Sequence, residues 1–134
     1  MHRRAFLTCA LCAAVAHPLA AHASAPASIG LILVGQSWCS ACKGAAATLH
    51  AALAQTPLPF LVASQDGAPI APFADYVDAR GHPIAMGITT VPVLLFVHTP
   101  TQDIIARIDG YTTPRRYLGQ IRATLLAAKE AGYV

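Results

Sequence analysis

The residues best suited to chemistry are the two cysteines of the stretch Trp38-Cys39-Ser40-Ala41-Cys42. An apolar run, Ile29 to Val34, precedes them and an alanine-rich segment follows. This context predicts that Cys39 lies at a helix N-terminus and Cys42 about one turn further on. Unpaired backbone N–H groups and the helix dipole favour a thiolate on the first sulfur. A cysteine pair with this spacing between a strand and a helix indicates reversible dithiol–disulfide chemistry.

The elements around the cysteines follow from the apolar pattern. Ile29 to Gly35 is continuously apolar, which predicts a strand buried on both faces. The spacing of alanine and leucine predicts a helix from Ser40 to about Ala54, which Thr56-Pro57 ends. Leu58 to Ser64 is predicted to be a second strand. Strand, helix and strand in this order predict a right-handed crossover and a parallel pair.

After the second strand, glycines and prolines predict loops with one short helix around Phe73 to Ala79. Two later runs, Val91 to His98 and Asp103 to Asp109, are rich in β-branched residues and flank a turn. They predict an antiparallel hairpin. Thr113 is a good N-cap for a closing helix from Pro114 to about Lys129.

Residues 1–23 have the pattern of a cleaved export signal. Met1 to Arg4 is basic, Ala5 to Val15 is apolar, and Ala21-His22-Ala23 is a small-x-small cleavage site. The apolar run is too short to span a membrane, which needs about 20 residues. Arg3 to Leu7 resembles the twin-arginine motif, so both the general and the twin-arginine export routes stay open.

Residues 24–134 are then predicted to form one exported domain. Without Arg3 and Arg4, seven Lys and Arg stand against six acidic residues, which gives no electrostatic reason to expect nucleic acid or an anionic membrane as partner. Cys9 and Cys12 would leave with the signal, so that Cys39 and Cys42 remain. A bridge between them closes too short a loop to restrain the unfolded chain, which favours a chemical role.

Taken together, these elements and motifs resemble the thioredoxin superfamily. The first anchor is Trp-Cys-x-x-Cys after the first strand. The second is Gly87 to Phe96, which is similar to the segment in which a cis proline, here Pro92, begins a core strand and faces the cysteines. Gly110-Tyr111 resembles the glycine-containing turn near the active site. The resemblance implies an α/β fold, a three-layer α/β/α arrangement with a mixed four-stranded sheet and a compact, glutaredoxin-sized core.

The resemblance also implies roles for individual residues. Cys39 would be the nucleophile that forms a mixed disulfide, and Cys42 would resolve it. The backbone of Val91, beside Pro92, would pair with an extended substrate chain, and Trp38 would supply an apolar wall, with core filling as the alternative. No cofactor is implied.

Two positions depart from thioredoxin itself. Leu33 stands where thioredoxin carries a buried acid, and Ala47 where it carries a helix-kinking proline. The group that carries the proton of Cys42 therefore stays open between water, Lys43 and Asp66.

Two other sets of residues are weaker candidates for a site. A tetrahedral metal centre needs two ligands beyond the cysteines, and the histidines that remain, His50, His82 and His98, form no spaced pair, so no metal site is expected. Tyr76, Tyr111 and Phe73 could line a substrate groove, although core packing suits Phe73 better.

The function that these features predict is a monomeric periplasmic thiol–disulfide oxidoreductase that reduces disulfides in exported partner proteins. It would draw electrons from an upstream thiol donor, which could be membrane-borne. The alternative is a non-enzymatic thioredoxin-like binding module or a copper metallochaperone.

Overall fold

The computed structural model describes residues 28–134, so the predicted signal, residues 1–23, lies outside the described residues. The elements follow in the order β1 (Ile29–Gly35), α1 (Ser40–Gln55), β2 (Phe60–Ser64), β3 (Val77–Asp78), the 3-10 turn η1 (Ala79–Gly81), β4 (Val93–His98), β5 (Asp103–Asp109) and α2 (Pro114–Glu130). None of the helices in this part of the chain has the length and apolar character needed to cross a bilayer.

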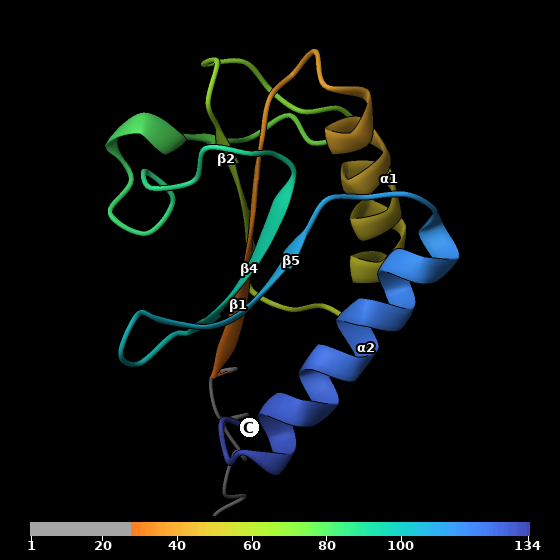
Figure 1. The fold of residues 1–134 in the computed structure, drawn as a ribbon, viewed down its shortest axis with the longest axis vertical. Coiled ribbons are helices and arrows are strands. Elements are labelled where there is room, and N and C mark those ends of the chain that lie inside the picture. Colours follow the sequence, from red (N-terminus) through yellow and green to blue (C-terminus); the bar gives the residue numbers. More distant parts are fainter. Residues whose placement is uncertain (1–27) are drawn as a thin grey trace, which may run out of the picture.

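The strands form one mixed sheet in the order β3-β2-β1-β4-β5. Figure 1 labels β1, β2, β4 and β5 of this sheet. β1 pairs in parallel with β2, as predicted, and antiparallel with β4. β4 and β5 form the predicted antiparallel hairpin, with an irregularity between Phe96 and Val97. The sheet has five strands instead of the predicted four, because the two residues of β3 pair with Ala63 and Ser64 at the edge of β2.

β1 is buried along its whole length, as its continuous apolar run predicted. Leu31 and Leu33 belong to the core on the side of the helices, whereas Ile32 and Val34 belong to the core on the opposite side. Successive side chains of a strand point to opposite faces, so a central strand covered on both sides must be apolar at every position.

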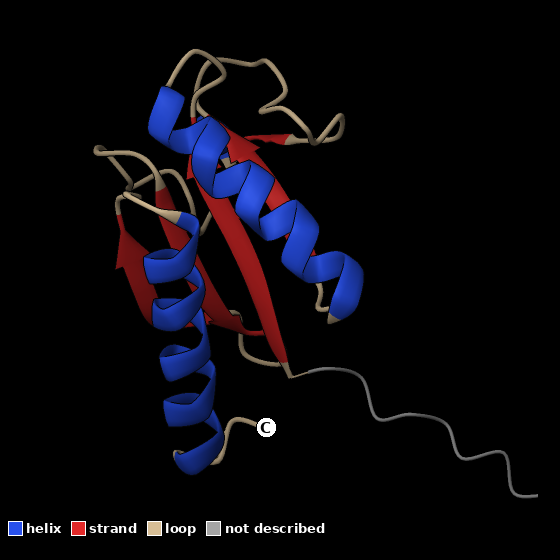
Figure 2. Ribbon diagram, turned by 90° about the vertical axis from the view of Figure 1, so that its right-hand side faces the viewer, coloured by secondary structure: helices blue, strands red, loops and turns tan. Residues whose placement is uncertain are grey.

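The two faces of the sheet are covered in different ways. Both α1 and α2 lie on one face, where they cross the strands side by side (Figure 2). The other face is covered by η1 and the loop that follows, through Ala79, Ile84, Ala85 and Ile88. The third layer of the predicted α/β/α arrangement is therefore an irregular segment with a single 3-10 turn.

Three predictions of where elements lie were wrong. The strand expected from Val91 to His98 begins at Val93, after Pro92, which has no N–H to donate to a ladder. The short helix expected around Phe73 to Ala79 is absent there: Val77 and Asp78 extend the sheet, and only then does the Asp78 carboxylate cap η1 through the Arg80 amide at 2.9 Å. β2 begins at Phe60 instead of Leu58, since Pro59 has no N–H to donate to a ladder.

The helix ends agree with the predictions. Thr113 caps α2 by accepting a hydrogen bond from the Arg116 amide at 3.3 Å, and Pro114 occupies the first turn. Thr56 ends α1 one residue before Pro57.

Candidate active site

Cys39 is the N-cap of α1. Its Sγ accepts a hydrogen bond from the backbone N–H of Cys42 at 3.2 Å, as N-cap side chains do with an amide of the first turn. Cys39 is half-buried, so part of the residue remains open to solvent. The predicted position of Cys39 at the helix N-terminus is therefore confirmed, and its sulfur lies against one of the free amides of the helix.

Cys42 is fully buried inside the first turn of α1. Both cysteines are free thiols. Burial, and then the hydrogen bond with the Cys39 thiol, raise the pKa of the Cys42 thiol from its ordinary value of 9.0 to about 12. The two cysteines therefore differ. Cys39 is partly exposed and its sulfur accepts a hydrogen bond from a helix amide, whereas the Cys42 thiol is buried and keeps its proton at neutral pH.

Gly35, the last residue of β1, brings the strand into direct contact with the buried thiol. A Cβ atom at Gly35 would lie 3.1 Å from Cys42 Sγ and 2.9 Å from Ile70 Cδ1. A side chain at this position would press on Cys42 Sγ and displace Ile70, so glycine allows the close approach.

Pro92 lies at the same end of the sheet. Val34 pairs with Val93, which places Pro92 beside Gly35 and hence on the flank of Cys42. The Val91–Pro92 peptide bond is cis, which confirms the predicted isomer. Pro92 is buried, and its carbonyl accepts the Gly110 amide at 2.8 Å. Gly110 has a φ of +78°, a conformation that favours glycine.

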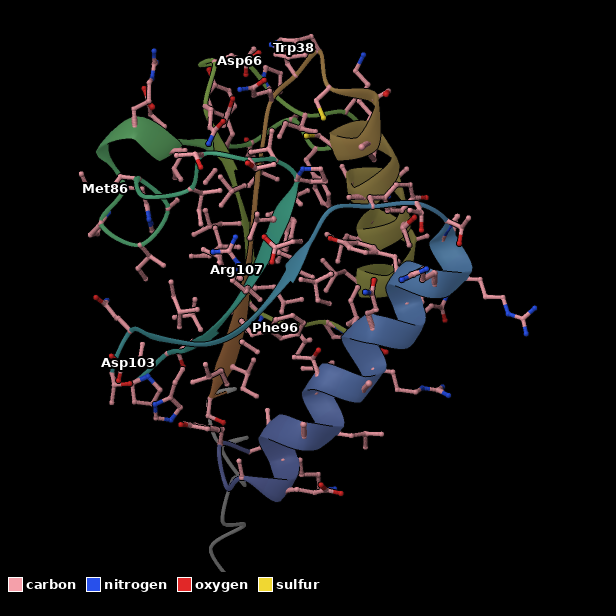
Figure 3. All side chains as sticks on the ribbon, in the orientation of Figure 1. Trp38, Asp66, Met86, Phe96, Asp103 and Arg107 are labelled. Atoms are coloured by element: carbon pink, nitrogen blue, oxygen red, sulfur yellow. The ribbon has the colours of Figure 1, made fainter. Side chains whose placement is uncertain are left out.

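Two residues predicted to bind substrate remain available on the surface near the cysteines. The Trp38 side chain is 71% exposed and does not fill the core. Figure 3 shows it at the end of the molecule where Asp66 also lies. Val91 is half-buried, and its backbone forms no hydrogen bond with any of residues 28–134. An exposed apolar side chain and an unpaired backbone segment are therefore available beside the cysteine pair.

Asp66 anchors the loop that leads into Cys39. Its carboxylate accepts hydrogen bonds from the Ser37 amide at 3.1 and 3.2 Å, from the Ser37 hydroxyl, and from the Ser64 hydroxyl at 2.8 Å. The Ser37 hydroxyl is the main cause that holds the pKa of Asp66 below its usual 3.8. A carboxylate so stabilised is a poor proton acceptor for Cys42, which weakens one of the three candidates for that role.

A chain of glutamine contacts joins the cysteine loop to the segment before Val91. The side-chain amide of Gln36 donates a hydrogen bond to Gln65 Oε1 at 3.0 Å, and the side-chain amide of Gln65 donates one to the Ile88 carbonyl at 2.7 Å. The Gln65 backbone N–H also donates to the Gly35 carbonyl at 2.9 Å. Sequence reasoning missed this chain, because neither glutamine lies in a motif.

Tyr117 of α2 is a second residue that sequence reasoning missed. It is fully buried in the same core cluster as Cys42, and its hydroxyl has no hydrogen-bond partner among residues 28–134. Burial, and after it the charge of a Cys42 thiolate and of Tyr111, raise the pKa of Tyr117. The hydroxyl therefore remains protonated. Leu33, at the place of thioredoxin's acid, lies in this cluster too.

The weaker candidates are engaged in packing and hydrogen bonds with other residues of the fold. Phe73 packs against the core and contacts Phe60 with ring centroids 4.7 Å apart. Tyr76 donates its hydroxyl to the Gly67 carbonyl at 2.7 Å, and Tyr111 packs on Gly44 of α1. Residues 28–134 contain no cluster of three or more His, Cys, Asp or Glu side chains arranged to hold a metal ion.

Comparison with known proteins agrees with this architecture. The family model described as TraF, F plasmid transfer operon protein, matches residues 19–114, which is more than half of the chain. The chain belongs to the TraF family. No curated protein sequence matches it.

Two solved structures show the same fold. MTB DsbF is 16% identical with a TM-score of 0.52, and the match covers 73% of this chain and 81% of that one. The thio-disulfide isomerase from Thermus thermophilus is 21% identical with a TM-score of 0.50, and 78% and 80% are covered. This TraF-family chain therefore has the fold of thioredoxin-like thiol–disulfide oxidoreductases.

Proposed function

We propose that this TraF-family protein is a periplasmic thiol–disulfide oxidoreductase that reduces disulfides in exported partner proteins. The observation that carries the proposal is the asymmetry of the two sulfurs. Cys39 is accessible and lies on a helix amide, while Cys42 is enclosed, protonated and one turn away. Exposed Trp38 and the unpaired Val91 backbone provide the surface on which an extended substrate segment would lie.

The reaction would proceed in two exchanges. The Cys39 thiolate attacks one sulfur of a substrate disulfide, forms a mixed disulfide, and releases the other substrate sulfur as a thiolate that takes up a proton. Cys42 then loses its proton and attacks Cys39 Sγ. The second substrate sulfur leaves and is protonated, so that the substrate gains two electrons and the protein ends as a Cys39–Cys42 disulfide.

The cycle needs a dithiol donor to reduce this disulfide again. We place the donor upstream in the same compartment, since the N-terminal pattern is that of an export signal. We infer that the protein reduces its substrates rather than oxidising them because the dipeptide Ser40-Ala41 lacks the histidine found between the cysteines of strongly oxidising relatives. The monomer carries the complete pair, so no second subunit is required.

The test is the reduction of insulin by dithiothreitol, with and without the protein. The wild-type chain should accelerate insulin precipitation, Cys39→Ser should return the rate to the uncatalysed value, and the exposed control Arg116→Ala should leave it unchanged. Titration against glutathione should give a reducing potential for the Cys39/Cys42 couple. Full activity of Cys39→Ser, or tight copper retention without turnover, would refute the proposal.

A further inference from the structure

An open apolar groove of about 770 Å³ lies between α1 and α2, away from the cysteines. Leu49 and Leu53 of α1 and Leu118, Leu125 and Leu126 of α2 contribute to its walls. Two of these leucines face solvent, with Leu118 40% and Leu126 56% exposed. An exposed row of large apolar side chains along a groove between helices is typical of a docking surface.

A basic stripe borders this groove. Arg115, Arg122 and Lys129 all line it and are exposed. They are seven residues apart, so they lie on one face of α2 over about 21 Å. None of them forms an ion pair with any of residues 28–134, in contrast to Arg80 and Arg107, which pair with Asp78 and Asp109. The groove therefore presents three uncompensated positive charges beside an apolar floor.

We propose that this groove docks an amphipathic helix of a partner protein, with leucine-like side chains on one face and acidic residues beside them. The length of the basic stripe corresponds to about fourteen residues of a helix. Acidic side chains at heptad spacing would meet all three cations, while the apolar face covers Leu118 and Leu126.

Charge argues against two other occupants. Residues 1–27 contain Arg3 and Arg4 and no Asp or Glu, so the chain's own N-terminal segment does not complement the stripe. A second copy packed helix against helix does not complement it either, because Glu130 is the single acid that α1 and α2 hold between them. An acidic helix from a partner of different sequence would supply the negative charge that these two helices lack.

The groove is separate from the redox chemistry. No cysteine lines it, and Leu49, its nearest α1 residue to the motif, follows Cys39 by ten positions, or about 15 Å along the helix. A helix held there would leave Trp38 and Cys39 free. The proposal therefore does not depend on the proposed redox function.

The experiment measures the anisotropy of two labelled 21-residue peptides titrated with the full chain. One peptide has leucine at heptad positions a and d and glutamate at e and g, and the other has lysine in place of glutamate. The acidic peptide should bind saturably and about tenfold more tightly than the basic one. The double variant Arg122→Glu/Lys129→Glu should reverse this preference, and Leu126→Ser should weaken both.

Arg116→Glu is the matched control, since Arg116 lies on α2 but does not line the groove. It should leave the peptide preference unchanged, and all variants should reduce insulin at the wild-type rate. Four results would overturn the proposal. These are no saturable binding of the acidic peptide, equal binding of both peptides, binding of phosphatidylglycerol vesicles that the acidic peptide does not displace, and a dimer that Leu126→Ser disrupts.

Discussion

The Asp66 carboxylate binds both the amide and the hydroxyl of Ser37, two residues before Cys39. Asp66 follows the carboxyl end of β2, and Ser37 follows the carboxyl end of β1. Because β1 and β2 are parallel, the two loops meet at the same edge of the sheet. The contact thus holds the entry to α1, and with it the cysteine pair, against the sheet.

Removing Asp66 should cost more stability than removing the Ser37 hydroxyl, because Ser37→Ala leaves the hydrogen bonds from the Ser37 amide in place. We expect Asp66→Ala to lower the free energy of unfolding by about 1 kcal/mol and Ser37→Ala to lower it by less, while the double variant should lose little more than Asp66→Ala alone. Urea unfolding of the wild type, both single variants and the double variant measures these free energies. Asp75→Ala, which removes an exposed acid, is the control. Losses that simply add would show that the two side chains act separately.

Removing the resolving sulfur should trap the first half of the reaction. Cys42→Ser leaves the accessible Cys39 in place, so a mixed disulfide with a disulfide-containing peptide should accumulate. Mass spectrometry of the non-reduced protein would detect it as an adduct that dithiothreitol removes. Cys39→Ser should form no such adduct, since the remaining thiol is fully buried. An equal yield of adduct from both variants would contradict the assigned order of attack.

The raised pKa of Cys42 should make the reduced protein less stable in alkali. Between 9.0 and about 12 the folded protein keeps the Cys42 proton while the unfolded chain has lost it, so unfolding releases a proton and stability falls as pH rises. The stability that the raised pKa of Cys42 contributes is fully present below pH 9.0. Urea unfolding across this range should show a steeper decline for the reduced wild type than for Cys42→Ala. Identical slopes would indicate an ordinary thiol.

Two glycines in helices should respond in opposite ways to alanine. A Cβ atom at Gly44 would lie 2.4 Å from Tyr111 Cε1, whereas one at Gly119 would meet nothing within 4 Å. Gly119→Ala should stabilise the protein by about 1 kcal/mol through helix propensity. Gly44→Ala should destabilise it by about 1–3 kcal/mol, because the Tyr111 ring must move. Thermal unfolding of both variants would compare them, and a stabilised Gly44→Ala would show that Tyr111 moves freely.

The buried hydroxyl of Tyr117 should be dispensable for stability. With no partner for its hydroxyl among residues 28–134, Tyr117→Phe should raise the free energy of unfolding by about 1 kcal/mol. Tyr76→Phe is the control, because that hydroxyl donates to the Gly67 carbonyl and its loss should destabilise the protein. A destabilised Tyr117→Phe that also slowed insulin reduction would instead show that the hydroxyl bonds near Cys42.

Much of the fold could be predicted because it depends on patterns local to each element. The unbroken apolar run of β1, the cap at Thr113 and the cysteines at the start of α1 each follow from a few neighbouring residues. The segment around Val77 could not be predicted, since its conformation depends on pairing with Ala63 and Ser64 rather than on its own residues.

The sequence by itself determined which residues could exchange a disulfide and that a strand and a helix would present them. Three features depended on the tertiary structure. The Asp66 carboxylate accepts hydrogen bonds from Ser37, Gly35 lies against Cys42, and an apolar groove with a basic border lies between α1 and α2. The physical reason is distance along the chain. The apolar periodicity of a helix or strand determines which of its faces is buried. Which distant residue packs against that face depends on the register of the sheet and on how the helices pack.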